Sequence, residues 1–514
     1  MLGFYHAGEA MRRFKPKSSP SPFLPRFMRK PEPPKSDTPK LPDDLVQIAS
    51  SVNEASKHVA GFFAAFLLVT TYLVISAAGT TDLDLLYESP LQLPILNVQV
   101  PLKFFYIWFP VIYVILHFNL FVHVRMLESQ VNQLVAAIDR HQENDPSFKE
   151  GEFGRRTEEL VFPFFINRIF FPNRGEVAWF QTMIRLMFTV TAIWIPLIAL
   201  GFTQYKFLPY HSPEVTWIHR SLIFLDCLVL FIGWVVDVRK RRRTFFLYRL
   251  SQFALSWSLA VAIYISVLAL TFPGEAIDSP KPAWWGLHRN LFIQGAVIGK
   301  DLPSFRDFAS SDDFEQRWLK KASALSLDNR DLSYARFEDC KILKVSIKHA
   351  NLTGASFIGN TIRNSIVDPL DVGTGAQAVI ERNKWKSSVL SIGLNSTKIV
   401  DDVFNDCQIS TKCPTILRPN STPFVLQTNA CSFLNCKLDI SCDEWDASVC
   451  EFYKCRGPVS ATTIKATFCS FLKGPPYEPK NTIAIHSGEE LRKLPTSTIN
   501  PLHPVDPFNS DDPW

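Results

Sequence analysis

The sequence predicts an α-helical membrane domain followed by a four-sided β-solenoid. Three observations predict this fold class. Long runs without a charged side chain fill residues 58–275, and from residue 332 to 367 every fifth residue is large and apolar. Nine of the ten cysteines also lie between Cys340 and Cys469, inside the second region. With 514 residues, the chain is long enough for two or more domains.

Residues 1–57 are expected to form a Pro-rich, basic arm on the cytoplasmic side. Nine prolines fall within residues 16–42, which favours an extended chain over a packed domain. The arm contains no apolar run long enough for a cleavable signal peptide. A mitochondrial presequence over residues 11–30 is an alternative, but these prolines oppose the amphipathic helix that it would need.

Five transmembrane helices are predicted after the arm. Four charge-free runs are each long enough for the roughly 20 helical residues that cross a hydrocarbon core of about 30 Å. A helix is favoured because it pairs its own backbone polar groups inside lipid. The remaining span is shorter and carries Asp226, but tryptophans mark both its ends and five basic residues follow it. The predicted spans are residues 59–79, 104–124, 186–205, 218–236 and 250–273, within a membrane domain of residues 58–275.

Lysine and arginine residues alternate in density between the segments that flank the spans. Residues 1–57 carry ten, residues 125–185 carry eight and residues 237–249 carry six. The intervening loops, residues 80–103 and 206–220, carry one and two. Because basic flanks stay inside, we expect the N-terminus inside and the C-terminus outside.

Two inner segments have recognisable patterns. Leu127, Val131, Leu134 and Ile138 form a stripe that is typical either of a short coiled coil or of a helix packed on its own neighbours. Residues 160–172 are too short to span the membrane and too apolar for water, so we expect them on the inner leaflet.

The five-residue period predicts a chain that bends once in every five residues. On a helix such steps would scatter around the axis, and on a flat strand they would alternate between the two faces. Four bent sides close a square coil, and coils stack about 4.8 Å apart with the large residues inside. The inward residues are Leu332, Phe337, Ile342, Ile347, Leu352, Phe357, Ile362 and Val367, and mostly small residues lie two places before each.

Most cysteines fit this repeat, because a large apolar residue follows two places after six of them. Cysteine then takes the place of the small inward residue. The alternative is a set of disulfides, for which Cys413 and Cys442 are the pair outside the spacing. A zinc site is disfavoured, since C-x-x-C pairs and neighbouring histidines are absent. Residues 368–403 depart from the period and are predicted to be an inserted loop or arm.

The register "ANLTG ASF" (Ala350–Phe357), after "RDLSY ARF" (Arg330–Phe337), resembles the pentapeptide-repeat family over about forty residues. The resemblance implies a right-handed quadrilateral β-helix, expected at residues 300–473 and followed by a loosely ordered tail at 474–514. The whole chain is similar to bacterial membrane proteins in which several spans precede such repeats. This similarity implies a bacterial cytoplasmic membrane protein, and the basic flanks predict that its repeat domain lies outside.

Few residues suggest chemistry. The sequence contains no phosphate loop, HExxH, GxSxG or dinucleotide fingerprint, so we expect no enzyme, no cofactor and no metal. Polar residues within the spans are the candidates, because such groups are costly at membrane depth. Each has a functional reading in transport and a structural reading as a hydrogen-bond partner. They are Asp226, His117, Asn119 and His123.

Two functions follow from these patterns. The first is an extracytoplasmic scaffold whose solenoid faces bind an unidentified protein, glycan or lipid. The alternative is a transporter or channel that uses the polar residues of the spans. Nucleic-acid binding is disfavoured, because the net charge is only +5 and residues 327–367 carry four acidic and six basic residues, without the acidic surface of a DNA mimic.

Overall fold

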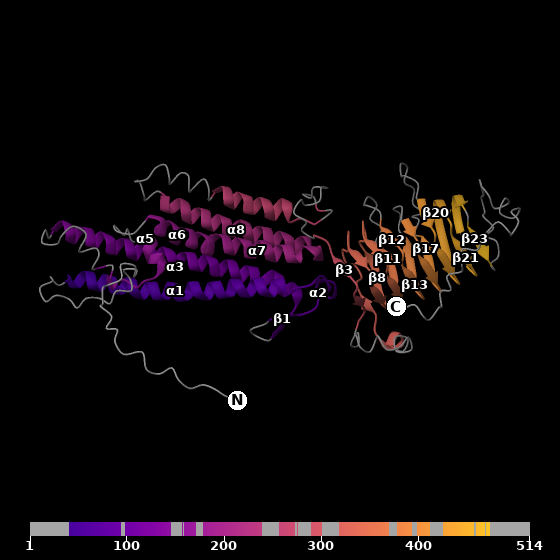
Figure 1. Ribbon diagram of the computed structural model, residues 1–514, viewed down its shortest axis with the longest axis horizontal. Coiled ribbons are helices and arrows are strands. Elements are labelled where there is room, and N and C mark those ends of the chain that lie inside the picture. The colour runs from indigo at the N-terminus through magenta and orange to yellow at the C-terminus, as the bar shows by residue number, and fades with distance from the viewer. Residues whose placement is uncertain are drawn as a thin grey trace, which may run out of the picture.

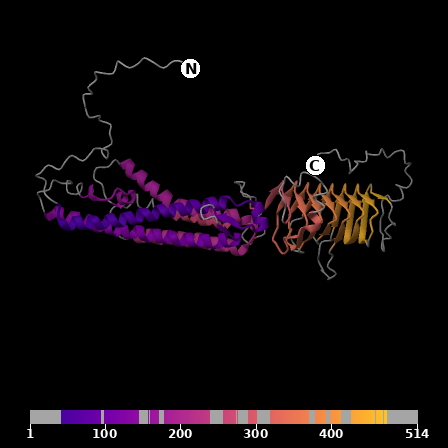
Figure 2. The same cartoon turned by 90° about the horizontal axis from the view of Figure 1, so that it is seen from below.

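A computed structural model of the chain consists of a bundle of long helices and a β-solenoid, joined end to end (Figure 1). The solenoid continues along the bundle axis (Figure 2). Most of the expected Pro-rich arm and the whole expected tail at 474–514 lie outside the described residues. The structure describes residues 41–93, 98–144, 157, 159–170, 178–238, 256–272, 275, 289–300, 318–369, 378–392, 398–411, 425–456, 459–467 and 469–472.

The helical bundle contains four helices that are long and apolar enough to cross a membrane: Asp43–Ala78, Leu102–Glu143, Trp179–Tyr210 and Pro213–Ile232. A shorter apolar helix, Ser256–Ala269, lies where the fifth span was expected, and residues 239–255 before it are not described. The elements are α1 (Asp43–Ala78), α2 (Asp82–Tyr87), β1 (Leu91–Leu93), β2 (Val98–Val100), α3 (Leu102–Asn144), α5 (Phe165–Phe170), α6 (Ala178–Thr189), η2 (Val190–Trp194), α7 (Ile195–Phe207), η3 (Leu208–Tyr210), α8 (Pro213–Val238) and η4 (Ile265–Ala269).

The first helix is longer than expected, which corrects the boundary of the arm. Helix α1 begins at Asp43, so residues 43–57 belong to the bundle. The reason is a second apolar stripe, in which Leu45, Ala49 and Val52 are buried. This stripe packs along the buried stripe of α3 that begins at Leu127, so the α3 stripe packs on a neighbouring helix of its own chain.

The apolar segment expected on the inner leaflet packs on the bundle. Ile166 and Asn167 are buried. The Asn167 amide nitrogen donates to Ser56 Oγ at 2.8 Å, and the rings of Phe63 and Phe165 meet edge-on at 5.4 Å. Phe164 and Ile166 are buried by this packing, whereas Leu160 remains 42% exposed.

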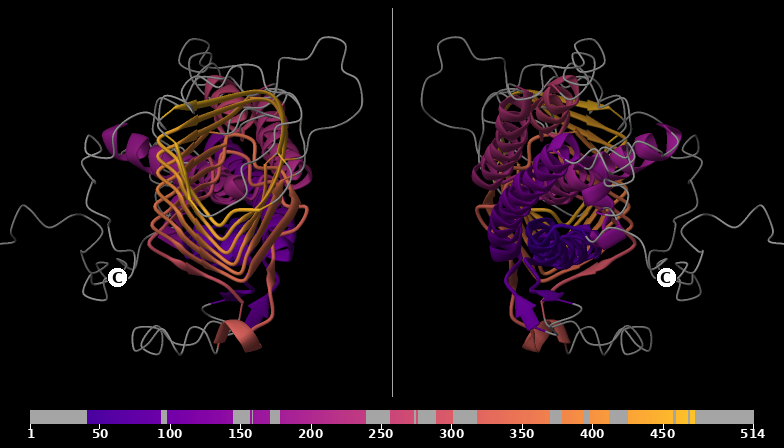
Figure 3. Two further views of the ribbon diagram at one scale, coloured as in Figure 1. Left: turned by 90° about the vertical axis from the view of Figure 1, so that its right-hand side faces the viewer. Right: turned by 90° about the vertical axis from the view of Figure 1, so that its left-hand side faces the viewer.

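The solenoid consists of parallel strands in one 8-stranded and one 13-stranded sheet, wound around a common interior (Figure 3). Its strands are β3 (Phe292–Gln294), β4 (Val297–Ile298), β5 (Leu325–Ser326), β6 (Arg336–Glu338), β7 (Lys341–Leu343), β8 (Val345–Ala350), β9 (Ser356–Ile358), β10 (Thr361–Arg363), β11 (Ile366–Pro369), β12 (Val379–Glu381), β13 (Lys384–Lys386), β14 (Val389–Ile392), β15 (Lys398–Val400), β16 (Val403–Asn405), β17 (Gln408–Thr411), β18 (Val425–Asn429), β19 (Ser432–Leu434), β20 (Lys437–Ser448), β21 (Glu451–Tyr453), β22 (Val459–Thr467) and β23 (Ser470–Leu472).

The residues at the five-residue period all lie inside this solenoid. The most exposed of them, Leu352, keeps only 7% of its surface, and Ile362 keeps none. In neighbouring coils, inward aromatic rings stack on one another. The rings of Phe337 and Phe357 lie 5.0 Å apart at an interplanar angle of 15°. A second column stacks Trp385, Phe404, Phe433 and Phe452.

The bend that the period requires has a clear backbone cause. Two places after each inward residue from Leu332 to Ile362, the chain adopts a positive φ, as at Asp339 (51°), Lys344 (53°) and Asn364 (51°). This left-handed conformation turns the strand through a corner. At Gly359 (69°) an added Cβ would lie 2.4 Å from Asp339 Oδ1, so a larger residue there would require the Asp339 side chain to move.

The predicted insertion at residues 368–403 is wrong for most of its length. Strands β12, β13 and β14 join the sheets there, pairing with β9, β10 and β11. Their inward residues Ile380, Trp385 and Leu390 repeat the five-residue spacing, but out of phase with Val367. The phase is lost because the number of positions from Val367 of β11 to Ile380 of β12 is not a multiple of five.

The four-sided cross-section applies best to the coils nearest the bundle. There a separate fourth side is present, where Asp331 bridges Asn351. Farther along, the single strand β20 pairs first with β17 and then with β18, so it covers two faces without a fourth side between them.

The cysteines line the interior. Six of them are buried free thiols: Cys340, Cys407, Cys431, Cys436, Cys450 and Cys455. Their thiols donate to backbone carbonyls, as from Cys436 Sγ to Phe404 O at 3.4 Å. Cys442 is also buried, and Cys413, the partner proposed for it, lies outside the described residues.

Candidate functional site

Two of the four polar residues expected in the spans meet in the centre of the bundle. His117 of α3 and Asp226 of α8 lie 2.7 Å apart, measured from Nδ1 to Oδ1, and keep 3% and 1% of their surface. Asn119 faces outward from the bundle, and His123 is half-buried against the ring of Phe62 at 5.2 Å. The structure therefore brings one pair together and leaves the other two residues apart from it.

The second nitrogen of His117 binds a backbone carbonyl that a proline has freed. His117 Nε2 lies 2.8 Å from Ala192 O, in the π-helical turn η2. Pro196 follows four places later and has no N–H to donate to that carbonyl. A wide π turn accommodates the proline ring and turns the freed carbonyl toward a neighbouring helix.

These contacts fix the number of protons in the pair. A carbonyl oxygen only accepts, so Nε2 of His117 carries a proton. The contact at 2.7 Å between Nδ1 and Asp226 Oδ1 then needs one further proton between these atoms. The pair therefore shares a single proton and has no net charge, whichever of the two residues holds it.

The surroundings of the pair are mostly apolar. The ring of Phe66 stacks on His117 at 5.2 Å. One helical turn away along α3, Tyr113 shares a hydrogen bond of 3.0 Å with Thr70 of α1. Asp226 Oδ2 is buried with no hydrogen-bond partner among the described residues. A buried acceptor left without a donor costs about 1–3 kcal/mol, so this oxygen is the one unsatisfied point of the pair.

A second polar cluster lies at the other π turn, and sequence reasoning missed it. Arg220 of α8 makes a two-point contact with Glu275, and its guanidinium lies 4.8 Å from the ring of Trp217. Gln204 donates to Ser266 O in η4 at 2.9 Å. Gln204 was a usable signal, since it is an amide inside a predicted span. Arg220 and Glu275 were not, because they border the spans in sequence.

The junction, where the first coil of the solenoid meets the bundle, is held by Arg330. Its guanidinium donates to Leu85 O and Leu86 O of α2, each at 3.2 Å, and to Glu88 at 3.1 Å. It also lies 4.4 Å from the ring centre of Tyr210. Burial by itself would raise the pKa of Glu88, but the Tyr210 hydrogen bond and the charges of Arg330 and Lys103 lower it.

Two further contacts complete the junction. Tyr87 OH donates to Gly299 O at 3.1 Å and accepts from Gly299 N at 2.9 Å. His211, at a φ of 56°, lies 3.1 Å from Ser333 Oγ and 3.7 Å from Asp331. Burial would raise the pKa of Asp331, but its bonds to His211 and Ser333 lower it.

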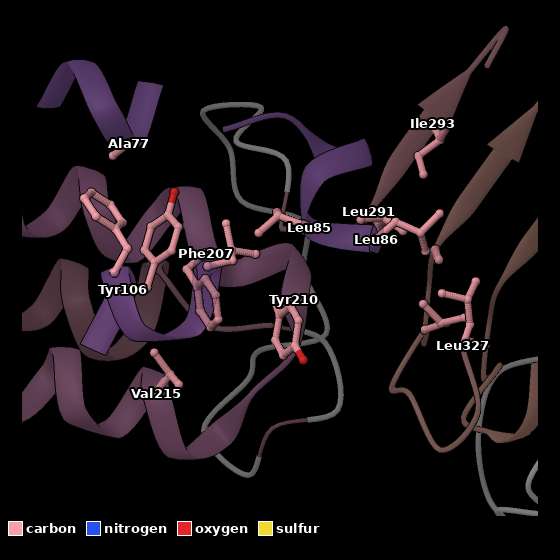
Figure 4. Packing of buried hydrophobic residues seen from close by; sticks show 14 of the residues in the cluster. Ala77, Leu85, Leu86, Tyr106, Phe207, Tyr210, Val215, Leu291, Ile293 and Leu327 are labelled. Atoms are coloured by element: carbon pink, nitrogen blue, oxygen red, sulfur yellow. The ribbon is translucent and has the colours of Figure 1, made fainter. Parts of the chain in front are cut away.

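Apolar side chains fill the space between these polar contacts. Leu85 of α2 points toward Phe207 of the bundle, whereas Leu86 lies beside Leu291 of the solenoid (Figure 4). The apolar core therefore continues from the bundle into the first coil as one cluster of buried side chains. Side chains from α2, η3 and the turn after η3 together fix the orientation of the solenoid.

Among the described residues, no group of three His, Cys, Asp or Glu side chains is arranged to hold a metal ion. Comparison with known protein families gives no family that matches the sequence, and no curated protein sequence matches it. The function must therefore be argued from the geometry.

Proposed function

We propose that the chain is a membrane-anchored scaffold of the pentapeptide-repeat type. In this proposal, the bundle holds a right-handed β-helix outside a bacterial cytoplasmic membrane, and the β-helix faces bind a protein, glycan or lipid. No catalytic step, cofactor or nucleic acid takes part. The four long apolar helices and the solenoid support the membrane-anchored architecture.

The junction is the observation that carries the proposal. A flexible linker would be enough to keep a domain near a membrane. Here the contacts of Arg330, Tyr87 and His211 hold the first coil against α2 and the turn after η3. The solenoid axis consequently follows the bundle axis (Figure 1). A rigid, directed surface binds with a smaller loss of conformational freedom, which is what a scaffold requires.

The solenoid is also long enough to present its faces away from lipid headgroups. Its smaller sheet has eight strands. At about 4.8 Å per strand, they extend roughly 30–35 Å from the junction. The outer coils therefore reach a partner that does not itself contact the membrane.

Sidedness is tested with fusions at the two ends of the described chain. A reporter that is active only outside the membrane should work after Leu472 and fail at Pro42. The alternating basic flanks are the reason, since they retain one side of each span in the cytoplasm. Activity at Pro42 and inactivity after Leu472 would invert the proposed topology.

Binding is tested by placing a photo-crosslinking amino acid on each face of the solenoid in the full chain. Lys398, Lys386 and Lys348 are exposed on three different faces, on strands β15, β13 and β8. One position should give a discrete adduct in cells, and the other two serve as matched controls. Glutamate at the adduct-forming position should weaken the adduct. Equal labelling at all three positions, or none, would contradict a scaffold with a specific face.

A further inference from the structure

The His117–Asp226 pair lies near the middle of the membrane domain. On α3, exposed apolar side chains extend from Phe104 to Met126, and His117 falls near the centre of that belt. On α8, the corresponding belt extends from Trp217 to Ile232 and includes Asp226. An ionisable pair at this depth is costly and points to a functional role.

On the side toward the solenoid, buried polar contacts begin one helical turn from the pair. The first step is the hydrogen bond between Tyr113 and Thr70. Farther along the same two helices, Tyr106 OH donates to Thr80 Oγ1 at 2.9 Å. His219 of α8 lies at this second level, with Nε2 2.6 Å from Tyr106 O.

The column, defined as Thr70, Tyr113, Tyr106, Thr80 and His219, ends beside the junction. Lys206 Nζ donates to Thr80 O at 3.1 Å, and the side chain of Lys206 is only partly buried. Tyr106 also packs at 4.7 Å on the ring of Phe207, close to Tyr210 of the junction (Figure 4). The polar route thus leads from mid-membrane to the solenoid end of the bundle.

On the opposite side of the pair, the described interior is apolar. Phe63 of α1, Leu120 and Val124 of α3 and Leu230 of α8 are buried there. The next buried polar contact in that direction is between Ser56 and Asn167. A series of buried hydroxyl and imidazole groups that can relay a proton therefore lies on the solenoid side of the pair. On the other side, the described groups of this kind are the half-buried imidazole of His123, which packs on Phe62, and the hydroxyl of Ser56, which is bonded to Asn167.

We propose that His117 and Asp226 form a proton-binding site that exchanges its proton with the solenoid side of the membrane through the column. Binding is a simple transfer: a hydronium ion at the junction gives one proton, which comes to lie between Nδ1 and Oδ1, and water remains. Release leaves a carboxylate facing an imidazole lone pair, with one uncompensated negative charge. This activity is independent of whether the solenoid faces bind a partner.

The neighbouring groups are compatible with this role. On α3 the titratable neighbour is Tyr113, and on α8 it is Cys227. Helix α1 presents the ring of Phe66 and the hydroxyl of Thr70, and η2 presents the carbonyl of Ala192. The unpartnered Asp226 Oδ2 is an acceptor available to the arriving proton.

The test uses the full chain in liposomes whose solenoids face outward, an orientation that is established by protease digestion of a separate aliquot. The buffer on the solenoid side is stepped from alkaline to acidic while the lumen is kept constant. Time-resolved infrared difference spectra follow the His117 ring, with bands assigned by ring ¹⁵N labelling and by their loss in His117→Gln. The bands should respond to the solenoid-side step. No response to either side, or a response to the lumen side alone, would overturn the proposal.

A second variant tests the route without removing the site. Tyr113→Phe combined with Thr70→Val cuts the column at its first step and leaves His117 and Asp226 in place. The response should slow at least about tenfold, equivalent to about 1.4 kcal/mol in the barrier. Leu116→Val, a half-buried apolar change on the same helix, is the matched control and should leave the rate unchanged. Equal rates in both variants would overturn the column as the route.

Discussion

The bundle and the solenoid satisfy their buried polar groups in opposite ways. In the bundle, each buried pair occurs once and joins residues far apart in the chain, as His117 joins Asp226. In the solenoid, one bond repeats from coil to coil. Cys340 N donates to Asn360 Oδ1, Asn360 N to Asn383 Oδ1, and Asn383 N to Asp402 Oδ1, at 2.7–2.9 Å.

The difference predicts how each domain tolerates substitution. A solenoid coil contacts mainly its two neighbours, so the loss of stability from a substitution in one coil should remain local. Its size should depend on whether the substituted residue points inward. A pair such as His117 and Asp226 occurs once in the bundle, so no equivalent contact remains when one partner is replaced. Local free energies from hydrogen exchange of the full chain separate the two cases, because they report each domain by itself.

The largest effect is expected inside the solenoid at Phe357, which keeps only 2% of its surface. Phe357→Asp removes a stacked ring and buries an unpaired charge, so it should cost the surrounding coils about 5 kcal/mol or more. Lys348→Ala, on an exposed position, is the control and should change stability by less than about 0.5 kcal/mol. Hydrogen exchange of the neighbouring strands measures both. Similar losses at the two positions would contradict the register.

Breaking the unique pair of the bundle should cost about 3–5 kcal/mol, because Asp226→Leu leaves His117 without its partner. The double variant with His117→Leu should regain most of this loss, since apolar residues often replace a buried ion pair at little cost. Hydrogen exchange in the solenoid strands should stay unchanged in the single and in the double variant. A double variant as unstable as the single one would show that the pair does not act as a unit.

The repeated hydrogen bonds of the solenoid end at Asp402, and this buried carboxyl should make the stability of the solenoid depend on pH. Burial raises the pKa of this carboxyl from 3.8 to about 7, although bonds from Asn383 and Trp385 oppose the shift. The folded pKa lies above the unfolded one, so the stabilising contribution is complete below pH 3.8 and is lost as pH rises toward 7. The solenoid should be about 2–3 kcal/mol less stable at about pH 8 than at about pH 5. Asp402→Asn should flatten this profile in chemical denaturation, and an unchanged profile would assign the dependence elsewhere.

The smallest effect concerns the corners. Val449 is β-branched, exposed and held at a φ of 54°. Val449→Gly should stabilise the adjacent coils by about 0.5–1 kcal/mol, because glycine adopts this conformation without strain. Asn435, at 53°, is the matched corner at which asparagine already tolerates the conformation. Asn435→Gly should therefore change local stability little, and equal gains at both corners would rule out strain as the cause.

The solenoid shows which inward residues a five-residue spacing can predict and where that prediction ends. The spacing from Leu332 to Val367 was enough to place eight inward residues, because each corner is formed by the residues next to it. The same spacing resumes at Ile380, Trp385 and Leu390, where it was not recognised. Counting the period afresh after each interruption would have found this coil. The lengths of the interruptions themselves follow no period.

The bundle shows where local patterns end. Charge-free runs were enough to predict the long helices, because backbone polar groups in lipid must pair within the segment. The start of α1 at Asp43 was missed, because the apolar residues of its first turns are buried only through packing on the apolar stripe of α3. Arg220 was counted as a loop cation and is instead buried beside Glu275.

The sequence by itself determined the order of the two domains, the helices and the bend at every fifth residue, because each depends on neighbours within a few positions. Only the tertiary structure decided which groups meet. Pro196 frees a carbonyl locally, but the imidazole that binds it comes from His117, 75 positions before Ala192. Arg330 reaches Leu85 across 245 positions to hold the solenoid on the bundle. Such contacts depend on helix packing and on the seating of the first coil, which no local pattern encodes.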